Sequence, residues 1–119
     1  MPNILKLRKG WEFDLIFRTG IRVNGELVRL LYLRDDNEPA VKFGCAVGKR
    51  LGKSHARNRG RRILREAFRQ LTKKENVTPG LKIVFNLTAK GLESKAQDIL
   101  GELEKLFRRK KLICFPVSQ

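Results

Sequence analysis

The stretch GKSHARNRGRRILREAF, from Gly52 to Phe68, contains five arginines and one lysine but a single acidic residue. Its apolar residues, continued to the next leucine of the chain, recur at the spacing of one helical face. That face consists of Ala56, Gly60, Ile63, Leu64, Ala67, Phe68 and Leu71. The pattern predicts a long amphipathic helix with one face in a core, and Ser54 is well placed to be its N-cap.

The rest of this predicted helix is basic, and the loop before it adds further cations. Between Lys49 and Lys74 the chain has eleven basic residues and one acidic residue, Glu66. Solvated helix faces usually mix both signs of charge, whereas a single-signed arc repels itself unless a polyanion offsets the repulsion. Arginine suits phosphates because its planar guanidinium can hold two oxygens at once. We therefore expect this surface to bind a polyanion.

One polar residue, Asn58, stands between two arginines in the segment ARNRG. Its side-chain amide can both donate and accept hydrogen bonds. The residue therefore either satisfies local backbone groups at the start of the helix or contacts the edge of a nucleotide. The sequence alone leaves these two interpretations equal.

The composition narrows the class of protein. The chain has 119 residues, 41% of them hydrophobic, a formal net charge of +15 and a pI of about 10.7. The length predicts one domain over residues 1–119, and the charge fits nucleic acid first, with an anionic membrane or an acidic protein as further partners. No apolar run approaches a membrane span, and MPNILKLRKG lacks the apolar core of a signal peptide. We expect a cytoplasmic protein.

The chemistry-bearing residues are too scattered for a self-contained active site. The one histidine, His55, has no Ser or Cys partner in a recognisable arrangement, and no P-loop or HExxH pattern occurs. Cys45 and Cys114 are far apart in the sequence and are expected to be reduced thiols rather than a disulfide. With so few His and Cys residues, we expect no metal site made by this chain.

The segments on either side of the basic helix predict the rest of the fold. KGWEFDLIFRTG has near-helical apolar spacing and ends at Gly20, and two extended segments follow, joined by the turn RDDNEP. In the first of them Val28, Leu30 and Tyr32 point one way while Arg29, Leu31 and Leu33 point the other. LKIVFNL should be another strand, and Ser94 and Gln97 have capping-box spacing before a last amphipathic helix. The order predicts a small α+β sandwich.

Several of these segments together resemble the protein subunit of bacterial ribonuclease P. The signature is the basic loop, RNR box and basic helix in FGCAVGKRLGKSHARNRGRRILREAF, residues 43–68. The resemblance extends to the first helix with Phe13 and Phe17 before a glycine, to the strand LKIVFNLTAKG and to the closing helix ELEKLFRR. It covers most of the chain and is far more specific than a basic helix alone.

The resemblance implies a fold and a function. The fold is a two-layer α+β sandwich with the order α-β-β-β-α-β-α, a mixed sheet and a left-handed βαβ crossover. This fold class is described as ribosomal-protein-S5-domain-2-like. The function is to assist a catalytic RNA in the endonucleolytic removal of the 5′ leader from precursor tRNA. The RNA carries the chemistry with Mg²⁺ ions held mainly by the RNA, and the protein aids the binding of these ions and of the substrate. The implied partners are that RNA and precursor tRNA, with no membrane and no required protein partner.

The resemblance also implies two binding surfaces. Contact with the catalytic RNA is expected from Lys49, Arg50, Lys53, Arg57, Asn58, Arg59, Arg61, Arg62 and Arg65. A cleft for the single-stranded leader is expected to include Phe13, Phe17, Lys90, and either Leu31 or Tyr32. Aromatic faces and cations suit single-stranded RNA because every base can stack. Core packing is the alternative role for the two phenylalanines.

Two other classes of protein compete with this interpretation. A basic helix could enter a DNA major groove, but helix-turn-helix geometry needs a second helix just before it, and a strand is predicted there instead. A ribosomal protein without processing activity would share the bulk composition, but not the whole set of motifs. One departure from the family is Gly60, which replaces a branched aliphatic residue and is expected to loosen the helix locally.

Overall fold

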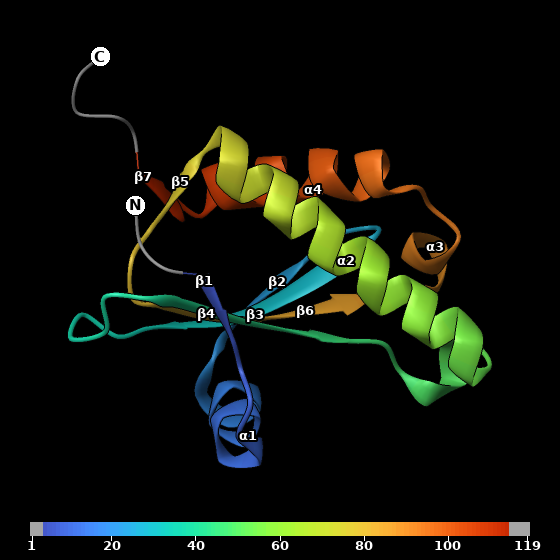
Figure 1. Cartoon of the computed structure of the whole chain (residues 1–119), viewed down its shortest axis with the longest axis horizontal. Coiled ribbons are helices and arrows are strands. Elements are labelled where there is room, and N and C mark those ends of the chain that lie inside the picture. Colours follow the sequence, from blue (N-terminus) through green and yellow to red (C-terminus); the bar gives the residue numbers. More distant parts are fainter. Residues whose placement is uncertain (1–3, 115–119) are drawn as a thin grey trace.

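The computed structural model describes residues 4–114 and shows a five-stranded mixed sheet with helices packed on it (Figure 1). The strands are β1 (Ile4–Lys6), β2 (Ile21–Asn24), β3 (Val28–Arg34), β4 (Val41–Ala46), β5 (Asn76–Val77), β6 (Leu81–Leu87) and β7 (Ile113–Cys114). The helical segments are α1 (Gly10–Thr19), the 3-10 turn η1 (Lys49–Leu51), α2 (Ser54–Lys74), α3 (Ala89–Leu92) and α4 (Ala96–Arg109). The predicted α-β-β-β-α-β-α order is confirmed, with short additional elements.

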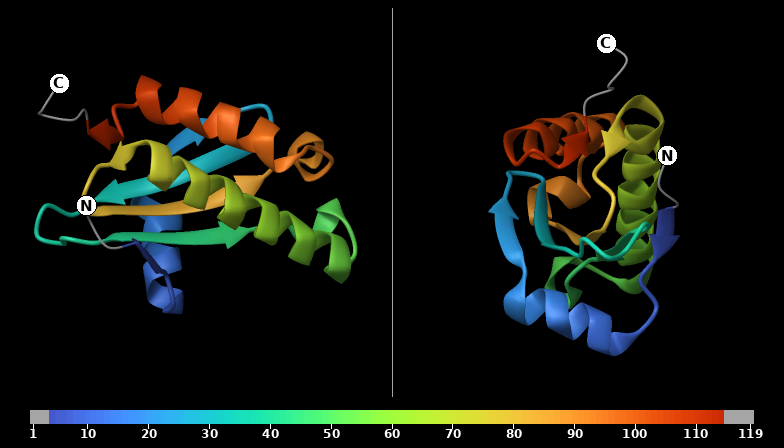
Figure 2. Two further views of the ribbon diagram at one scale, coloured as in Figure 1. Left: turned by 45° about the horizontal axis from the view of Figure 1, so that its top comes forward. Right: turned by 90° about the vertical axis from the view of Figure 1, so that its left-hand side faces the viewer.

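The sheet combines parallel and antiparallel pairs. Its strand order is β1-β4-β6-β3-β2, and β5 and β7 form a separate antiparallel pair. β4 pairs in parallel with both β1 and β6, whereas β3 pairs antiparallel with β6 and β2. The parallel neighbours β4 and β6 are joined through α2. In the left view of Figure 2, α2 lies in front of the sheet, β4 and β6 both point to the right, and β6 lies above β4. When the view is turned so that the strands point up, β6 is to the left of β4, which makes the crossover left-handed, as expected.

The sheet has a core on each face. The larger cluster lies beneath α2 and α4 and includes Val28, Leu30 and Tyr32 of β3. A smaller cluster lies beneath α1 and includes Leu31, with Leu33 packed against it. The predicted alternation of β3 is therefore confirmed. The sheet and the α2/α4 layer make up the two-layer sandwich, and α1 adds a partial third layer on the opposite face (Figure 1).

The apolar stripes of the two long helices lie where the periodicity placed them. Gly60, Leu64, Ala67, Phe68 and Leu71 of α2 are buried. So are Ile99, Leu103, Leu106 and Phe107 of α4. The four rings of Phe43, Phe68, Phe85 and Phe107 pack in a chain with centroid separations of 4.8–6.3 Å. Within residues 4–114, every helix is too short or too polar to cross a bilayer.

The helix starts differ from the predicted caps. α2 begins at Ser54 itself, with Lys53 at the N-cap position and no side-chain cap bond. α4 likewise has Lys95 at its N-cap, while the Ser94 hydroxyl donates to the Lys90 carbonyl oxygen instead of capping α4. The two predicted caps are wrong because these hydroxyls have other partners: the Ser54 hydroxyl accepts from the Arg57 guanidinium at 3.3 Å.

Gly60 allows α2 to approach its neighbours closely. A Cβ atom built there would lie 2.8 Å from a Leu92 methyl carbon, 3.0 Å from one of Leu87 and 3.2 Å from one of Val47. A larger side chain at this position would displace these methyl groups. Gly60 therefore has a packing role that the sequence did not predict: the missing side chain lets α2 lie against β6 and α3.

A carboxylate of α4 holds the turn between β2 and β3. Glu102 accepts hydrogen bonds from the backbone N–H groups of Glu26, Leu27 and Val28 at 2.8, 2.8 and 2.7 Å. Gly25 leaves room for this carboxylate, because a Cβ there would lie 2.8 Å from the Glu102 carboxyl carbon. The β2–β3 turn and the last helix are thus joined by three charge-assisted hydrogen bonds.

Candidate nucleic-acid interface

The start of α2 and the loop before it carry a basic surface, here called the basic arc. It consists of Lys49, Arg50, Lys53, Arg57, Asn58, Arg59, Arg61, Arg62 and Arg65. All nine side chains are exposed except those of Arg57 and Arg61, which are half-buried. No ion pair among residues 4–114 involves any of these cations. Their charge is therefore available to an external anion.

Two cations in the second half of α2 are neutralised within the protein. Arg69 pairs with Glu66 at 2.7 Å, and Lys74 pairs with Glu104 at 2.8 Å. A hydrogen bond from Gln70, followed by the charge of Arg69, holds the pKa of Glu66 below its usual value, so this carboxyl stays ionised. The free positive charge of α2 is consequently concentrated toward the start of the helix.

Asn58 positions an arginine of the arc. Its side-chain carbonyl accepts a hydrogen bond from the Arg61 guanidinium, one turn further along the helix. The side chain thus bonds to neither of the local backbone groups that the sequence left as an alternative. Because the amide NH₂ group stays available to donate, Asn58 can orient Arg61 and still contact a nucleotide.

Arg57 is the least available cation of the arc. Its Nη2 atom donates to the Ser54 hydroxyl, and its Nε atom is buried without a hydrogen-bond partner among the described residues. A buried donor without an acceptor costs about 1–3 kcal/mol. A partner can therefore contact the outer edge of the Arg57 guanidinium, but it cannot surround the group, because Nη2 already donates to Ser54 and Nε is buried.

The expected leader-binding phenylalanines both lie on α1 but differ in burial. The Phe13 ring packs on β4, where a Cβ at Gly44 would lie 2.5 Å from a ring carbon. Phe17, one turn later, is 40% exposed. Phe13 is thus part of the packing between α1 and the sheet, while Phe17 presents an open aromatic face beside it. Only glycine at position 44 leaves room for the Phe13 ring.

The structure separates the two cleft candidates of β3. Leu31 lies in the cluster beneath α1, with Phe13 packed against that cluster. Tyr32 belongs to the cluster on the opposite face, beneath α2 and α4. Both are buried, at 8% and 7% exposure. Leu31 therefore shares a face with the phenylalanines, and Tyr32 does not.

Lys90 lies apart from the two phenylalanines. It is on α3, just beyond the end of β6, and its ammonium group is 3.2 Å from a carboxylate oxygen of Glu26 in the turn after β2. Both side chains are exposed, at 70% and 78%. Such an exposed pair contributes at most about 1 kcal/mol. An RNA phosphate could therefore replace Glu26 at little cost.

A row of polar side chains on the α1 face of the sheet was missed from the sequence. The register pairs Asn24 with Arg29, Arg29 with Asn86, and Asn86 with Ala46. In the adjacent row Arg22 pairs with Leu31. The alternation of β3 already placed Arg29 on this face, but only the pairing of three strands brings these residues together.

The polar row continues into the basic arc. A cleft of about 560 Å³ is lined by Arg29 and Asn86 on one side and by Lys49 and Arg50 of η1 on the other. The α1 face of the sheet and the start of α2 therefore form one continuous polar surface around the β4 end. A single-stranded polyanion could follow this surface from the sheet to the helix.

Cys45 is a half-buried thiol next to the basic arc. Burial raises its pKa to about 12, although Arg65, Lys6 and Arg61 act in the opposite direction. Because only the thiolate reacts, we expect Cys45 in a Cys114→Ser variant to be alkylated by iodoacetamide at pH 8 at least about 100-fold more slowly when folded than in guanidinium. The measurement is the rate of mass increase. Equal rates in the two states would contradict a half-buried, protonated thiol.

The same thiol affects stability at high pH. The ordinary pKa of 9.0 is raised on folding, so the unfolded chain loses this proton first. Stability contributed by the protonated thiol is thus complete below about pH 9 and is lost as the pH rises toward 12.

Comparisons with known proteins point to one family. The family model described as Ribonuclease P matches residues 1–111. A curated "Ribonuclease P protein component" from a Thermoanaerobacter species is 31% identical over 110 residues, which cover 92% of each chain. The fold is similar to that of the Staphylococcus aureus RNase P protein, with a TM-score of 0.77 at 20% identity, covering 92% of this chain and 97% of that one. The RNase P protein from Thermotoga maritima gives a TM-score of 0.74 at 25% identity, covering 87% and 96%.

Proposed function

This chain belongs to the ribonuclease P protein family, which serves in the 5′ processing of tRNA, and from this premise we propose a role for each of its two surfaces. The basic arc binds the catalytic RNA subunit. The α1 face of the sheet takes up the 5′ leader of precursor tRNA. The protein thereby holds enzyme and substrate together in one ribonucleoprotein endoribonuclease, which we place in the cytoplasm.

The observation that carries the first half of this proposal is the absence of ion pairs in the basic arc among residues 4–114. Elsewhere in the described chain, acidic residues are paired with Lys42, Lys74, Lys82 and Arg108. Other cations without an ion pair among the described residues, such as Lys95 and Lys105, are spread over the chain, whereas those of the arc are gathered on η1 and the first half of α2, and such a cluster favours binding to a polyanion. The RNA backbone supplies the missing negative charge and releases counterions on binding.

The second half rests on the geometry around α1. Phe17 offers an exposed aromatic face, and the polar row of Asn24, Arg29 and Asn86 lies on the same face of the sheet. Stacking on an aromatic ring together with cations along a groove binds single strands without reading their sequence. A leader varies in sequence between tRNAs, so recognition of this kind suits it.

We further propose that the RNA carries out the cleavage, with Mg²⁺ ions held mainly by the RNA. Several of the described carboxylates are used by the fold itself: Glu12 and Glu38 contact Lys42, Glu75 contacts Arg108, and Glu102 binds backbone N–H groups. No group of three or more His, Cys, Asp or Glu residues within 4–114 is arranged to hold a metal ion. The part of this chain in the reaction is to bind and orient the two RNAs.

The decisive experiment mixes this chain with a bacterial ribonuclease P RNA and precursor tRNA at a low Mg²⁺ concentration. We expect the protein to raise the rate of 5′ leader removal over that of the RNA alone, because its cations replace part of the screening that Mg²⁺ provides. Cleavage no faster than with RNA alone would contradict the proposal.

Phe17 provides a test of the leader surface. Phe17→Ala removes the exposed ring, and since stacking is worth about 1–3 kcal/mol per base, we expect the preference for precursor over mature tRNA to fall about tenfold. The measurement is the affinity of the assembled enzyme for each RNA.

The matched control for Phe17 is Trp11→Ala. Trp11 is also an exposed aromatic residue of α1, at 59% exposure. It lies on the side of the helix away from Phe13 and Phe17, because successive residues turn by about 100°. We expect this variant to keep the preference. An equal loss of affinity for both RNAs with Phe17→Ala would argue against the leader assignment.

A further inference from the structure

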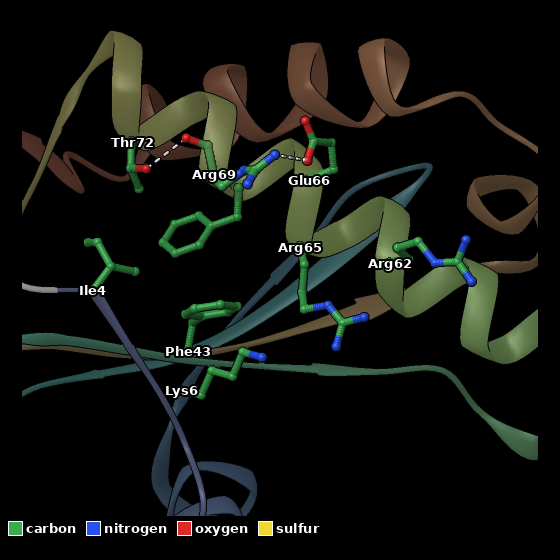
Figure 3. Close-up of a pocket in the computed structure, with 9 residues that line it drawn as sticks. Ile4, Lys6, Phe43, Arg62, Arg65, Glu66, Arg69 and Thr72 are labelled. Atoms are coloured by element: carbon green, nitrogen blue, oxygen red, sulfur yellow. Dashed lines mark hydrogen bonds and ion pairs between the residues drawn. The ribbon is translucent and has the colours of Figure 1, made fainter.

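A groove lies between the edge strand β1 and the outer side of α2 (Figure 3). Its volume is about 480 Å³, within the range of roughly 300–1,000 Å³ that holds small ligands. β1 contributes Ile4 and Lys6 as one wall, and α2 contributes the other. The groove is separate from the α1 face of the sheet, because it opens on the face that α2 covers.

The floor of the groove is apolar and aromatic. Phe43 of β4 and Phe68 of α2 line it, with ring centroids 5.0 Å apart and ring planes tilted by 52°. Phe68 is also part of the core and makes further ring contacts with Phe85 and Phe107. The floor is therefore held rigidly, while Ile4, 37% exposed, leaves an apolar edge open to solvent. A flat apolar group can pack here without rearranging the fold.

The rim of the groove is positively charged. Lys6 and Arg65 reach the same side of Phe43 from opposite walls, and Arg62 follows along α2 (Figure 3). These three cations have no ion pair among residues 4–114. The acidic residue of the groove, Glu66, is bound to Arg69 and Gln70. The groove thus combines a flat apolar floor with unneutralised cations, which matches an aromatic base attached to a phosphate.

We propose that this groove holds one unpaired nucleotide of the catalytic RNA, with its base against Phe43 and Ile4 and its phosphate between Lys6 and Arg65. The inference rests on the proposed function, since Arg62 and Arg65 belong to both the groove and the basic arc. The catalytic RNA supplies the nucleotide, rather than the leader, because the leader surface lies across the sheet. The nucleotide anchors the RNA at a defined point of α2, where phosphate contacts alone would let it slide.

The test fills the groove without changing its charge. Thr72 lines the groove and is half-buried, so Thr72→Phe places a ring in the space while keeping all the cations. We expect the Kd for the catalytic RNA to rise about tenfold, with the preference for precursor over mature tRNA unchanged. Thr19→Phe is the control: the Thr19 hydroxyl, like that of Thr72, bonds to a carbonyl of its own helix, but it lies on α1. It should change the Kd by less than about twofold.

Chemical probing of the RNA bases provides a second readout. Wild-type protein is expected to protect one unpaired base that Thr72→Phe leaves reactive. An abasic substitution at that nucleotide should weaken binding of wild-type protein about tenfold and leave Thr72→Phe unaffected, a result that does not depend on how well the variant folds. Wild-type affinity in Thr72→Phe, or no base whose protection depends on the groove, would overturn this inference alone. Failure of the wild-type chain to bind the RNA would overturn the proposed function with it.

Discussion

Replacing Arg61 and Arg65 together with alanine is expected to weaken binding to the catalytic RNA by about 30- to 100-fold at 150 mM salt. Both side chains lie on the basic arc without an ion pair in residues 4–114, and each charge-assisted contact to a phosphate is worth roughly 1.5–3 kcal/mol before screening. The dependence on salt should also become shallower. Two lost phosphate contacts reduce the slope of log K against log salt by roughly 1.4–1.8.

The measurement is a salt series of Kd values for the RNA, with a control that changes the net charge equally. Lys95→Ala with Lys105→Ala removes two exposed cations at the start and along the length of α4, outside the basic arc. We expect this pair to alter the Kd by less than threefold. A similar loss in both double variants would show that overall charge, rather than the arc, determines binding.

The largest expected effect on stability comes from Glu102. Glu102→Ala removes the acceptor of three backbone N–H groups and leaves that of Val28, a fully buried residue, without its partner. Unsatisfied buried donors and lost charged hydrogen bonds together should lower the free energy of unfolding by about 3 kcal/mol. Since small domains are stable by only about 5–15 kcal/mol, this is a large fraction. Urea or thermal unfolding of the isolated protein measures the change.

Two further variants test the cause of this loss. Glu102→Gln keeps one carbonyl oxygen but turns an NH₂ group toward backbone donors, so we expect about half of the destabilisation. Glu93→Ala makes the same change in charge at an exposed residue whose side chain makes no hydrogen bond or ion pair within residues 4–114, and should alter stability by less than about 0.5 kcal/mol. If Glu93→Ala were as costly as Glu102→Ala, the three hydrogen bonds would not be the reason.

These two predictions separate the surfaces that bind from the contacts that fold the chain. The arginines of the arc have no charged partner among the described residues, so their removal should leave the unfolding transition nearly unchanged. Glu102 lies on the far side of α4 from the arc, and its loss should reduce RNA binding only as far as the folded fraction falls. Measuring RNA affinity and unfolding free energy on all five variants tests this division directly.

The ends of the helices were less predictable than their faces. The apolar stripes of α2 and α4 could be predicted because apolar residues recur at helical spacing along many positions. One residue that departs from the spacing does not hide the pattern. A cap depends on one hydrogen bond at one residue. Ser54 and Ser94 both had suitable side chains, yet the Arg57 guanidinium and the Lys90 carbonyl bind them instead. Such local competition among polar groups leaves no periodic signal.

The candidate site shows the same contrast. The basic arc could be named residue by residue from the sequence because its members are close together along the chain, in α2 and the loop before it, and match the basic loop and RNR box of the family. The row of Asn24, Arg29 and Asn86 could not, because β6 comes from a part of the chain far from the β2–β3 hairpin and strand register is a property of the assembled sheet. The choice between Leu31 and Tyr32 also needed the position of α1.

Local residue patterns therefore predicted the long helices, their buried faces and the basic surface of α2, since each depends on near neighbours along the chain, while the full element order followed from the family resemblance. Three features became visible only in the folded chain: Glu102 holds the β2–β3 turn, Gly60 brings α2 against its neighbours, and β1 and α2 enclose a groove over Phe43. These features join residues separated by tens of positions. Their contacts form only after the chain has packed, so no local pattern of residue types records them.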